Sequence, residues 1–435
     1  MHTKTQRLQT FLGSAGFKKY FNNTSWLFIG RLTNMVVGFI ATTYVIRTLG
    51  PESYGTVSYI LSFAGLGSVL ANLGIDQILS RELLVQKENR GTLLGTAFII
   101  KTTGAVVSTL LLITTSIAID NSAFLTLLIA FMSFSYFFSA FGVFNTLFQV
   151  DVRSKYPSLL SIWVVLILSV LKIIVVFSGL PIEFIIGVFF IEPILYAVGL
   201  VFLYVKHYSR HIYKLSFDMN IAKIFIKESW PLILSSAFIV IYSRIDQVML
   251  KNMVNETSVG FYDSAVRIAE LWYFIPGILG SALFPAMVNA HLTDTSIYTL
   301  RMKRLYFLLW WLGIAISASV FVLAPFIIHT LYGPAYDMSI LVLRIYVCAT
   351  IPIFLAMIIQ QHLVTKGLTR VTFFMTFLGM VANIVLNIFL IPRYGIYGAA
   401  VATLVSYSLM PLSILLLKST REHALLVLTS ISHFR

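Results

Sequence analysis

Residues Leu159–Phe177 read LLSIWVVLILSVLKIIVVF, a stretch long and apolar enough to cross a lipid bilayer as one helix. Arg153 and Lys155 lie just before it. The connection after it (178–181, SGLP) carries no charge and leads into a second apolar stretch, Ile182–Val205. Positively charged loops stay on the cytoplasmic side of a membrane. The pattern therefore predicts a pair of membrane-spanning helices that begins and ends on the cytoplasmic side.

The same alternation of charge extends along the whole chain. The amino terminus and every second connection hold 22 of the 31 lysines and arginines, the other connections hold three, and six lie within the apolar stretches. We therefore predict an all-α integral membrane protein with twelve transmembrane helices and both termini cytoplasmic. The expected spans are Ser25–Ile46, Thr56–Ser80, Thr92–Ile119, Ala123–Phe148, Leu159–Phe177, Ile182–Val205, Trp230–Leu250, Tyr262–Ala290, Leu305–Leu331, Ser339–Leu363, Val371–Ile391 and Ile396–Leu417.

The composition excludes several classes of protein. Of the 435 residues 58% are hydrophobic and 11% are charged, against about 25% charged in a soluble domain. The net charge of +14 does not indicate nucleic acid binding, because most of it lies in short loops where it matches anionic lipid headgroups. Cys348 is the single cysteine, so we expect no disulfide and no metal site, and no motif indicates a cofactor.

The chain divides into two similar halves. We predict a six-helix lobe over residues 1–205, a basic cytoplasmic linker over 206–229, and a second six-helix lobe over 230–435. Both halves begin on the same side of the membrane, so we expect a pseudo-two-fold axis along the membrane normal, as in many transporters. The matching positions are Ser25-Trp26 with Ser229-Trp230, Arg47 with Lys251, Glu52 with Glu256 and, one residue out of step, Gly55 with Gly260.

Charged residues inside the expected spans are the main guide to function. An Asp, Lys or Arg at the centre of a membrane helix costs about 2.5–3.5 kcal/mol on insertion scales. Such residues must therefore line a wet cavity, pair with one another, or reach the interface by extending their side chains. We counted ten: Arg31, Asp76, Lys101, Lys172, Glu192, Arg244, Asp246, Arg267, Glu270 and Arg344.

Depth within the span separates these residues. Arg31, Lys101, Glu192 and Glu270 lie deepest, so we expect them to face a lumen or to pair, whereas the other six lie near enough to a span end to reach the interface. Arg267 and Glu270 stand three residues apart on one helical face, which predicts an ion pair between them.

The six cations outnumber the four acids, which suits an anionic substrate such as a diphosphate, matched by the planar fork of arginine. Glu192 precedes Pro193, whose missing N–H frees a carbonyl in mid-span, so this position fits either a proton or cation site or a structural kink. The candidate substrate-binding residues are Arg31, Lys101, Arg267 and Arg344, and the candidate ion-coupling or paired acids are Glu192, Glu270, Asp76 and Asp246.

The chain carries several motifs of a known family. It resembles the polysaccharide-repeat flippases of the Wzx type, in the multidrug/oligosaccharidyl-lipid/polysaccharide exporter superfamily. The motifs are Arg47–Gly55, Arg244–Leu250, Val259–Glu270, Phe284-Pro285, and Asn383 and Asn387 followed by Ile391–Thr403.

The resemblance implies a function. Such proteins consist of two six-helix lobes that alternate between inward-open and outward-open states. They move an undecaprenyl-diphosphate-linked oligosaccharide to the periplasmic leaflet of the bacterial inner membrane. Coupling to a gradient of H⁺ or Na⁺, as in an antiporter, is implied, and a complex with a polysaccharide polymerase and a chain-length regulator is a further expected partner. O-antigen, in lipopolysaccharide biosynthesis, is the expected glycan. A cationic central cavity is also implied, and Arg31, Lys101, Arg267 and Glu270 fit it.

Other readings stay open at this point. A multidrug exporter of the same superfamily usually carries organic cations, which call for an acidic cavity, and the peptidoglycan-precursor flippases usually have fourteen spans. A membrane glycan polymerase generally places catalysis in a sizeable external loop, whereas the longest outer connection here is Lys251–Phe261. No P-loop, HExxH or GxSxG motif is present, so we expect a transporter and not an enzyme.

Overall fold

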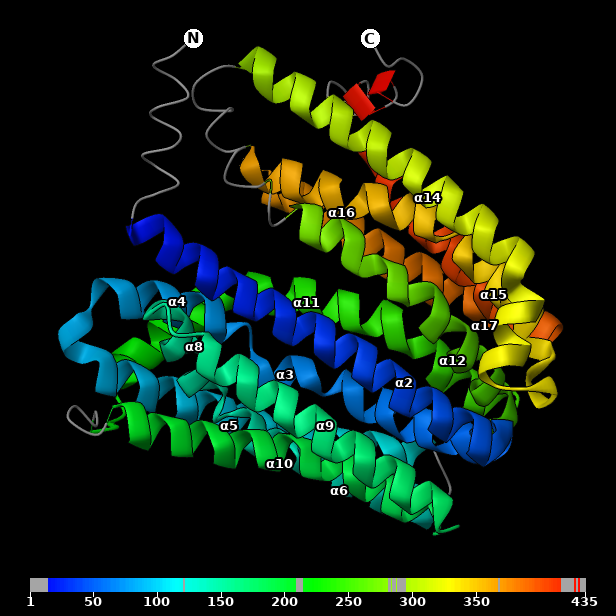
Figure 1. Cartoon of the computed structure of the whole chain (residues 1–435), viewed down its shortest axis with the longest axis horizontal. Coiled ribbons are helices and arrows are strands. Elements are labelled where there is room, and N and C mark those ends of the chain that lie inside the picture. The colour runs from blue at the N-terminus through cyan, green and yellow to red at the C-terminus, as the bar shows by residue number, and fades with distance from the viewer. Residues whose placement is uncertain are drawn as a thin grey trace. The chain divides into compact units, whose positions relative to one another are not determined.

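The regular elements of the chain are all helical in the part that the structure describes (Figure 1). Nine helical segments of that part are long and apolar enough to cross a membrane. The chain is therefore an all-helical, multi-pass membrane protein. This computed structural model describes residues 15–119, 122–208, 214–280, 295–366 and 368–415, together with positions 283, 287, 426–427 and 429–430.

The chain packs as two compact units. The first unit consists of Met1–Thr48 and Phe63–Ser236, and the second consists of Leu49–Ser62 and Ala237–Arg435. Residues 49–62, from the first half of the sequence, thus pack with the second half. The expected domain boundaries at either end of the 206–229 linker stay predictions.

The first unit is built mainly from the helices of the first sequence half. Its core gathers aliphatic and aromatic residues, among them Leu79, Phe144 and Tyr204, and the last two rings stack at a centroid distance of 4.4 Å. The helices are α2 (Ala15–Leu66) apart from its residues 49–62, α3 (Ser68–Asn72), α4 (Ile75–Val85), η1 (Lys87–Asn89), α5 (Arg90–Ile119), α6 (Ala123–Phe134), α7 (Tyr136–Ser139), α8 (Gly142–Val150), α9 (Lys155–Phe177), α10 (Ile182–His207) and the first part of α11 (Met219–Met253).

The second unit contains the rest of α11 and the elements that follow it. Its helices pack around tyrosines that are fully buried, such as Tyr262, Tyr346 and Tyr407. The remaining elements are α12 (Glu256–Glu270), η2 (Leu271–Tyr273), α14 (Thr295–Leu331), η3 (Pro334–Tyr336), α15 (Met338–Val347), α16 (Thr350–Thr365), α17 (Thr369–Leu412) and η4 (Ser413–Leu415).

Among the described residues, four of the expected spans are not single helices. The eighth, Tyr262–Ala290, begins as α12 and η2, and the tenth, Ser339–Leu363, is divided into α15 and α16. The second, Thr56–Ser80, is interrupted after Leu66, and Leu73 and Gly74 adopt left-handed backbone angles (φ 49° and 60°) before α4 begins. Glycine adopts such angles readily. The fourth, Ala123–Phe148, is divided into α6, α7 and α8. The interruptions of the second and fourth spans place backbone polar groups inside the first unit, which is tolerated only where protein or a wet cavity satisfies them.

In two places, consecutive expected spans follow one another as two helices joined at a kink, with no loop between them. The helix α2 continues through a kink at Gly50 (φ 75°, ψ 171°), and α17 continues through one at Gly395 (φ 55°, ψ −132°). Most of the second half of the eighth expected span, including Phe284 and Pro285, lies outside the described residues. The count of twelve spans and the orientation in the membrane therefore stay predictions.

Candidate functional site

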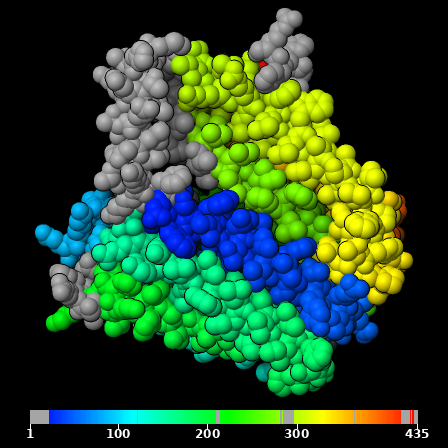
Figure 2. Space-filling model, in the orientation of Figure 1, coloured from blue at the N-terminus to red at the C-terminus, as the bar shows by residue number. Residues whose placement is uncertain are grey.

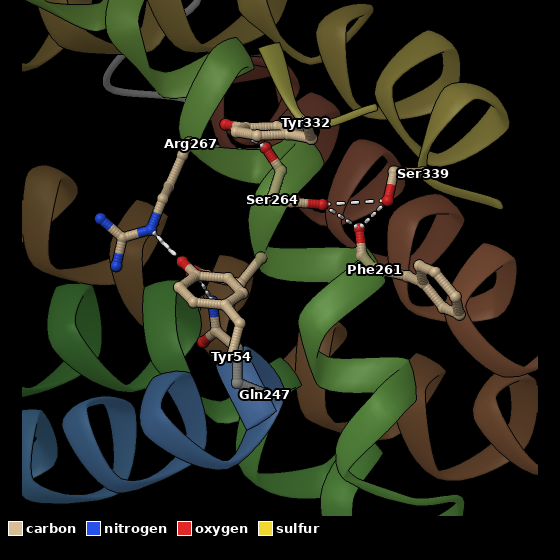
Figure 3. Close-up of polar contacts among 8 residues, drawn as sticks. Tyr54, Gln247, Phe261, Ser264, Arg267, Tyr332 and Ser339 are labelled. Atoms are coloured by element: carbon tan, nitrogen blue, oxygen red, sulfur yellow. Dashed lines mark hydrogen bonds and ion pairs between the residues drawn. The ribbon is translucent and has the colours of Figure 1, made fainter. Parts of the chain in front are cut away.

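A buried carboxylate and a partly exposed arginine lie one turn apart on α12 in the second unit, and Figure 3 shows the arginine, Arg267. In α12, Arg267 Nε donates to Asp263 Oδ2 at 2.8 Å and to the Tyr54 hydroxyl at 2.5 Å. The Tyr54 hydroxyl donates in turn to Asp263, and Gln247 Nε2 donates to the other carboxylate oxygen at 3.2 Å. The side chain of Asp263 is 1% exposed and that of Arg267 is 32% exposed. Figure 3 shows the two terminal nitrogens of the guanidinium pointing away from Tyr54.

The ion-pair partner of Arg267 differs from the predicted one. Among the described residues Arg267 pairs with Asp263, four positions earlier, and not with Glu270. Glu270 is the last residue of α12, before the chain tightens into η2, and it accepts a hydrogen bond from the Tyr346 hydroxyl at 3.3 Å. The prediction of an Arg267–Glu270 pair is therefore wrong. Asp263 was missed, although its i, i+4 spacing from Arg267 is a standard signal for a helical ion pair.

The helix α12 is fixed in place by hydroxyl contacts to neighbouring elements. The Ser264 and Ser339 hydroxyls lie 2.9 Å apart, and Ser339 also donates to the Phe261 carbonyl at 2.8 Å (Figure 3). The Tyr332 hydroxyl donates to the Ser264 carbonyl at 3.3 Å. These bonds tie α12 to α15 and to the loop before η3, so that Arg267 projects from a rigid support.

A second acid of this unit has only neutral partners. Asp246 is 3% exposed and accepts hydrogen bonds from Asn387 Nδ2 at 2.6 Å, from the Thr403 hydroxyl at 2.6 Å and from the Tyr262 hydroxyl at 2.5 Å. Within the described part of the chain no lysine or arginine forms an ion pair with it. The carbonyl oxygen of Asn387 is buried beside it, and the structure shows no hydrogen-bond donor for this atom among the residues it describes.

The kink at Gly395 creates this cluster. Asn383 Nδ2 and the Thr403 hydroxyl lie 3.5 Å apart although they are 20 residues apart in sequence. A straight helix of that length would separate them by about 30 Å. The chain therefore turns back at Gly395 and brings both arms of α17 onto Asp246.

The two clusters are linked by neighbouring residues on the same two helices. On α11, Asp246 bonds to Tyr262 and the next residue, Gln247, bonds to Asp263. Tyr262 and Asp263 are in turn adjacent on α12. A single helix pair thus connects the Asp246 carboxylate to Asp263, the partner of Arg267.

The first unit brings two of the predicted residues together. Lys101 Nζ lies 2.7 Å from Asp76 Oδ1, and the Thr146 hydroxyl donates to the same oxygen at 3.4 Å. The Lys101 side chain is 2% exposed, whereas that of Asp76 is 49% exposed. The buried Lys101 is therefore held by an acid that is half exposed.

The other predicted residues lie apart from one another. Arg31 is exposed on α2. Arg344 Nε donates to the Phe321 carbonyl at 3.1 Å, and its guanidinium stands 5.3 Å from the centre of the Phe321 ring. Glu192 is exposed on α10 and lines a polar cavity of the first unit. The residues that sequence reasoning missed are Tyr54 and Asp263 near Arg267, and Asn387 and Thr403 near Asp246.

The helical arrangement places the chain in one structural class. It superposes on an inward-facing multidrug resistance MATE family transporter of the MOP superfamily with a TM-score of 0.76, at 15% identity, over 91% of this chain and 96% of that one. It also superposes on the lipid II flippase MurJ in an inward closed conformation, with a TM-score of 0.68, at 15% identity, over 95% and 88% of the two chains. The fold is that shared by these transporters.

The sequence then identifies the family. Residues 20–291 match the polysaccharide biosynthesis protein family, and the chain belongs to it, which confirms the resemblance drawn from the motifs. This is a family of membrane transporters and not of enzymes. The chain is 22% identical to the "Putative O-antigen transporter" of Shigella dysenteriae over 403 residues, 90% of this chain and 98% of that protein. It is 28% identical to the "Probable flippase AglR" of Haloferax volcanii over 184 residues, which span only 36% of that protein.

Proposed function

We propose that this protein is a flippase for isoprenoid-diphosphate-linked oligosaccharides. It moves the headgroup of an undecaprenyl-diphosphate glycan from the cytoplasmic to the periplasmic leaflet of a bacterial inner membrane by alternating access. Family membership and the O-antigen transporter relative, which aligns over 90% of this chain, support the proposal. O-antigen repeat units are the expected cargo.

The arginine cluster of the second unit is the observation that carries this proposal. Asp263 and Tyr54 hold Arg267 by its Nε, which leaves the two terminal amino groups as a paired donor on a partly exposed side chain. A guanidinium presented in this way suits the bidentate recognition of a phosphate or diphosphate. An organic cation would be repelled at this position, so the cluster does not favour drug export. Arg31, exposed on α2, is the second cation proposed for the headgroup.

Asp246 is the residue proposed to bind the coupling ion. A buried carboxylate without a cationic partner is costly unless a proton or metal cation neutralises it. Carboxylate, hydroxyl and amide oxygens surround this position, and such oxygen ligands suit a small hard cation such as Na⁺ as well as a proton. The Asp246–Tyr262 and Gln247–Asp263 bonds then couple ion binding to Arg267.

A strain that lacks the gene tests the proposed function. We expect completed lipid-linked repeat units to accumulate on the cytoplasmic leaflet, and the wild-type gene to release them. An Arg267→Ala gene should fail to release them, and an Arg267→Lys gene should fail or restore only part, because lysine lacks the planar fork. Normal surface polysaccharide in the deletion strain would contradict the proposal and would direct attention to efflux of cationic dyes.

A further inference from the structure

The first unit contains a polar cavity that none of the proposed steps uses. Its volume is about 520 Å³, within the range of roughly 300–1,000 Å³ that is typical of small-molecule sites. Residues of α2, α7, α8, α9 and α10 line it, and α2 and α9 lie side by side on the face shown in Figure 2. The polar residues that line it are Asn34, Ser139, Ser161, Lys172, Glu192 and Tyr196.

The cavity wall is built by local features of the sequence. Gly38 and Gly142 both line it, and a Cβ atom at either would meet only ordinary contacts, with Val165 at 4.0 Å and with Lys101 Nζ at 3.8 Å. Because glycine has no side chain, the space beside the backbone at these two positions is part of the cavity. On α10 the cavity lies next to Pro193, which cannot donate a backbone hydrogen bond within the helix.

One buried group of the cavity lacks a partner. Asn34 Nδ2 donates to the Ser161 hydroxyl, but its carbonyl oxygen is buried and meets no donor in the described part of the chain. A buried polar atom without a partner costs about 1–3 kcal/mol. A ligand that brings a hydroxyl or amide N–H to this oxygen would remove that cost.

The charges of the cavity favour a neutral ligand. Lys172 is 7% exposed and its ammonium stands 3.9 Å from the centre of the Phe189 ring, while Glu192 brings a carboxylate to the same space. A metal cation would be repelled by the lysine, and an anion would be repelled by the glutamate. A neutral molecule rich in hydroxyls can donate to the carboxylate and accept from the ammonium. The rings of Phe138 and Tyr196 offer apolar faces to the C–H groups of a sugar.

We propose that this cavity is a saccharide site, which binds a sugar of the transported glycan through Asn34, Lys172 and Glu192. The inference rests on the proposed flippase function and adds to it a place where the glycan itself is recognised.

Glycan binding and flipping by the full-length protein test this assignment together. The probe is the lipid-free repeat-unit oligosaccharide, released by mild acid from the pool that the deletion strain accumulates, and saturation-transfer NMR reports its binding to protein in nanodiscs. We expect Glu192→Gln to weaken binding about tenfold, since a hydrogen bond to a charged acceptor is replaced by a weaker bond to a neutral one. Gly38→Leu, which fills the cavity, should abolish it. Glu183→Gln, an exposed glutamate on the same helix that does not line the cavity, is the matched control.

The outcomes separate the two proposals. One outcome supports the saccharide site. In it the wild-type protein flips the lipid-linked glycan, and only Glu192→Gln and Gly38→Leu bind the sugar more weakly and flip more slowly. Wild-type flipping with unchanged binding and flipping in both variants overturns the saccharide site and leaves the flippase standing. If the wild-type protein does not flip the glycan, the flippase proposal is contradicted. If the two variants still weaken sugar binding in that case, the cavity is a sugar site that serves another process.

Discussion

Gly55 and Gly260 lie at a reciprocal crossing of two helical segments. A Cβ atom at Gly55 would collide with the carbonyl oxygen of Glu256, and one at Gly260 would collide with the carbonyl oxygen of Pro51. These positions correspond, one residue out of step, in the internal repeat predicted from the sequence. Residues 49–62 are thus held in the second unit by backbone contact as well as by the Tyr54 hydroxyl.

A methyl group at this crossing should destabilise the protein strongly. We expect Gly260→Ala or Gly55→Ala to lower the free energy of unfolding by about 1–3 kcal/mol or more, because each opposing atom is rigid backbone. Thermal unfolding of purified protein in detergent measures the effect. The matched control is Gly65→Ala on α2, where a Cβ atom meets nothing within 4 Å. This change should be neutral or stabilising by about 0.5–1 kcal/mol. Equal effects at the three glycines would contradict the crossing.

The Asp263–Arg267 pair should show strong energetic coupling. Each single alanine variant leaves a charged group without its partner, while the double variant removes both charges. We expect the sum of the two single-variant losses in unfolding free energy to exceed the loss of the double variant. The difference, which is the interaction energy, should be about 0.5–3 kcal/mol. A double-mutant cycle in mixed detergent micelles gives this value. Strictly additive losses would show that the contact contributes no stability.

Removing Asp76 and removing Lys101 should lower the stability of the protein by different amounts. Asp76→Asn leaves a buried ammonium unpaired, which costs about 3–5 kcal/mol, whereas Lys101→Met leaves an acid whose side chain is already half exposed. We therefore expect Asp76→Asn to lower the unfolding temperature more than Lys101→Met does. A larger loss in Lys101→Met would contradict the assignment of Lys101 as the buried member of the pair and Asp76 as the exposed one.

Asp246→Asn should uncouple flipping from the H⁺ or Na⁺ gradient proposed to drive it. The amide is nearly the same size as the carboxylate but cannot be neutralised by a proton or bind a cation by charge. We expect the variant to fold and to lose the dependence of flipping on an imposed H⁺ or Na⁺ gradient. The control is Asp337→Asn, an acid with a 66% exposed side chain outside the cluster, which should keep that dependence. An unaltered gradient response in Asp246→Asn would remove this residue from the coupling mechanism.

Local patterns in the sequence predicted the regular helices well. The expected spans Thr92–Ile119 and Leu159–Phe177 lie within α5 and α9, because length and hydropathy are properties of a single stretch. The breaks around Leu73 and between α6 and α8 were not predicted, since both interrupt sequences that remain apolar throughout. A hydropathy scale measures the free energy of transferring a side chain from water into lipid, and it carries no information on backbone angles.

The composition of the site was harder to predict than its location. Arg267 and Asp246 were identified because each is a charged residue in an apolar stretch. The free-energy cost of placing such a charge in the membrane depends on that residue alone. Tyr54 lies 213 positions from Arg267, and Thr403 lies 157 positions from Asp246. Only the packing of the second unit and the reversal at Gly395 bring these partners together, and neither is a local property.

Flipping in proteoliposomes tests the central claim most directly. Purified protein is reconstituted with undecaprenyl-diphosphate oligosaccharide, and periodate or a lectin outside the vesicles reports the glycan that reaches the outer leaflet. The account predicts that wild-type protein exposes the glycan held on the inner leaflet, and that Arg267→Ala protein at equal amount does not. Glycan that stays on its original leaflet with active, folded wild-type protein would contradict the account.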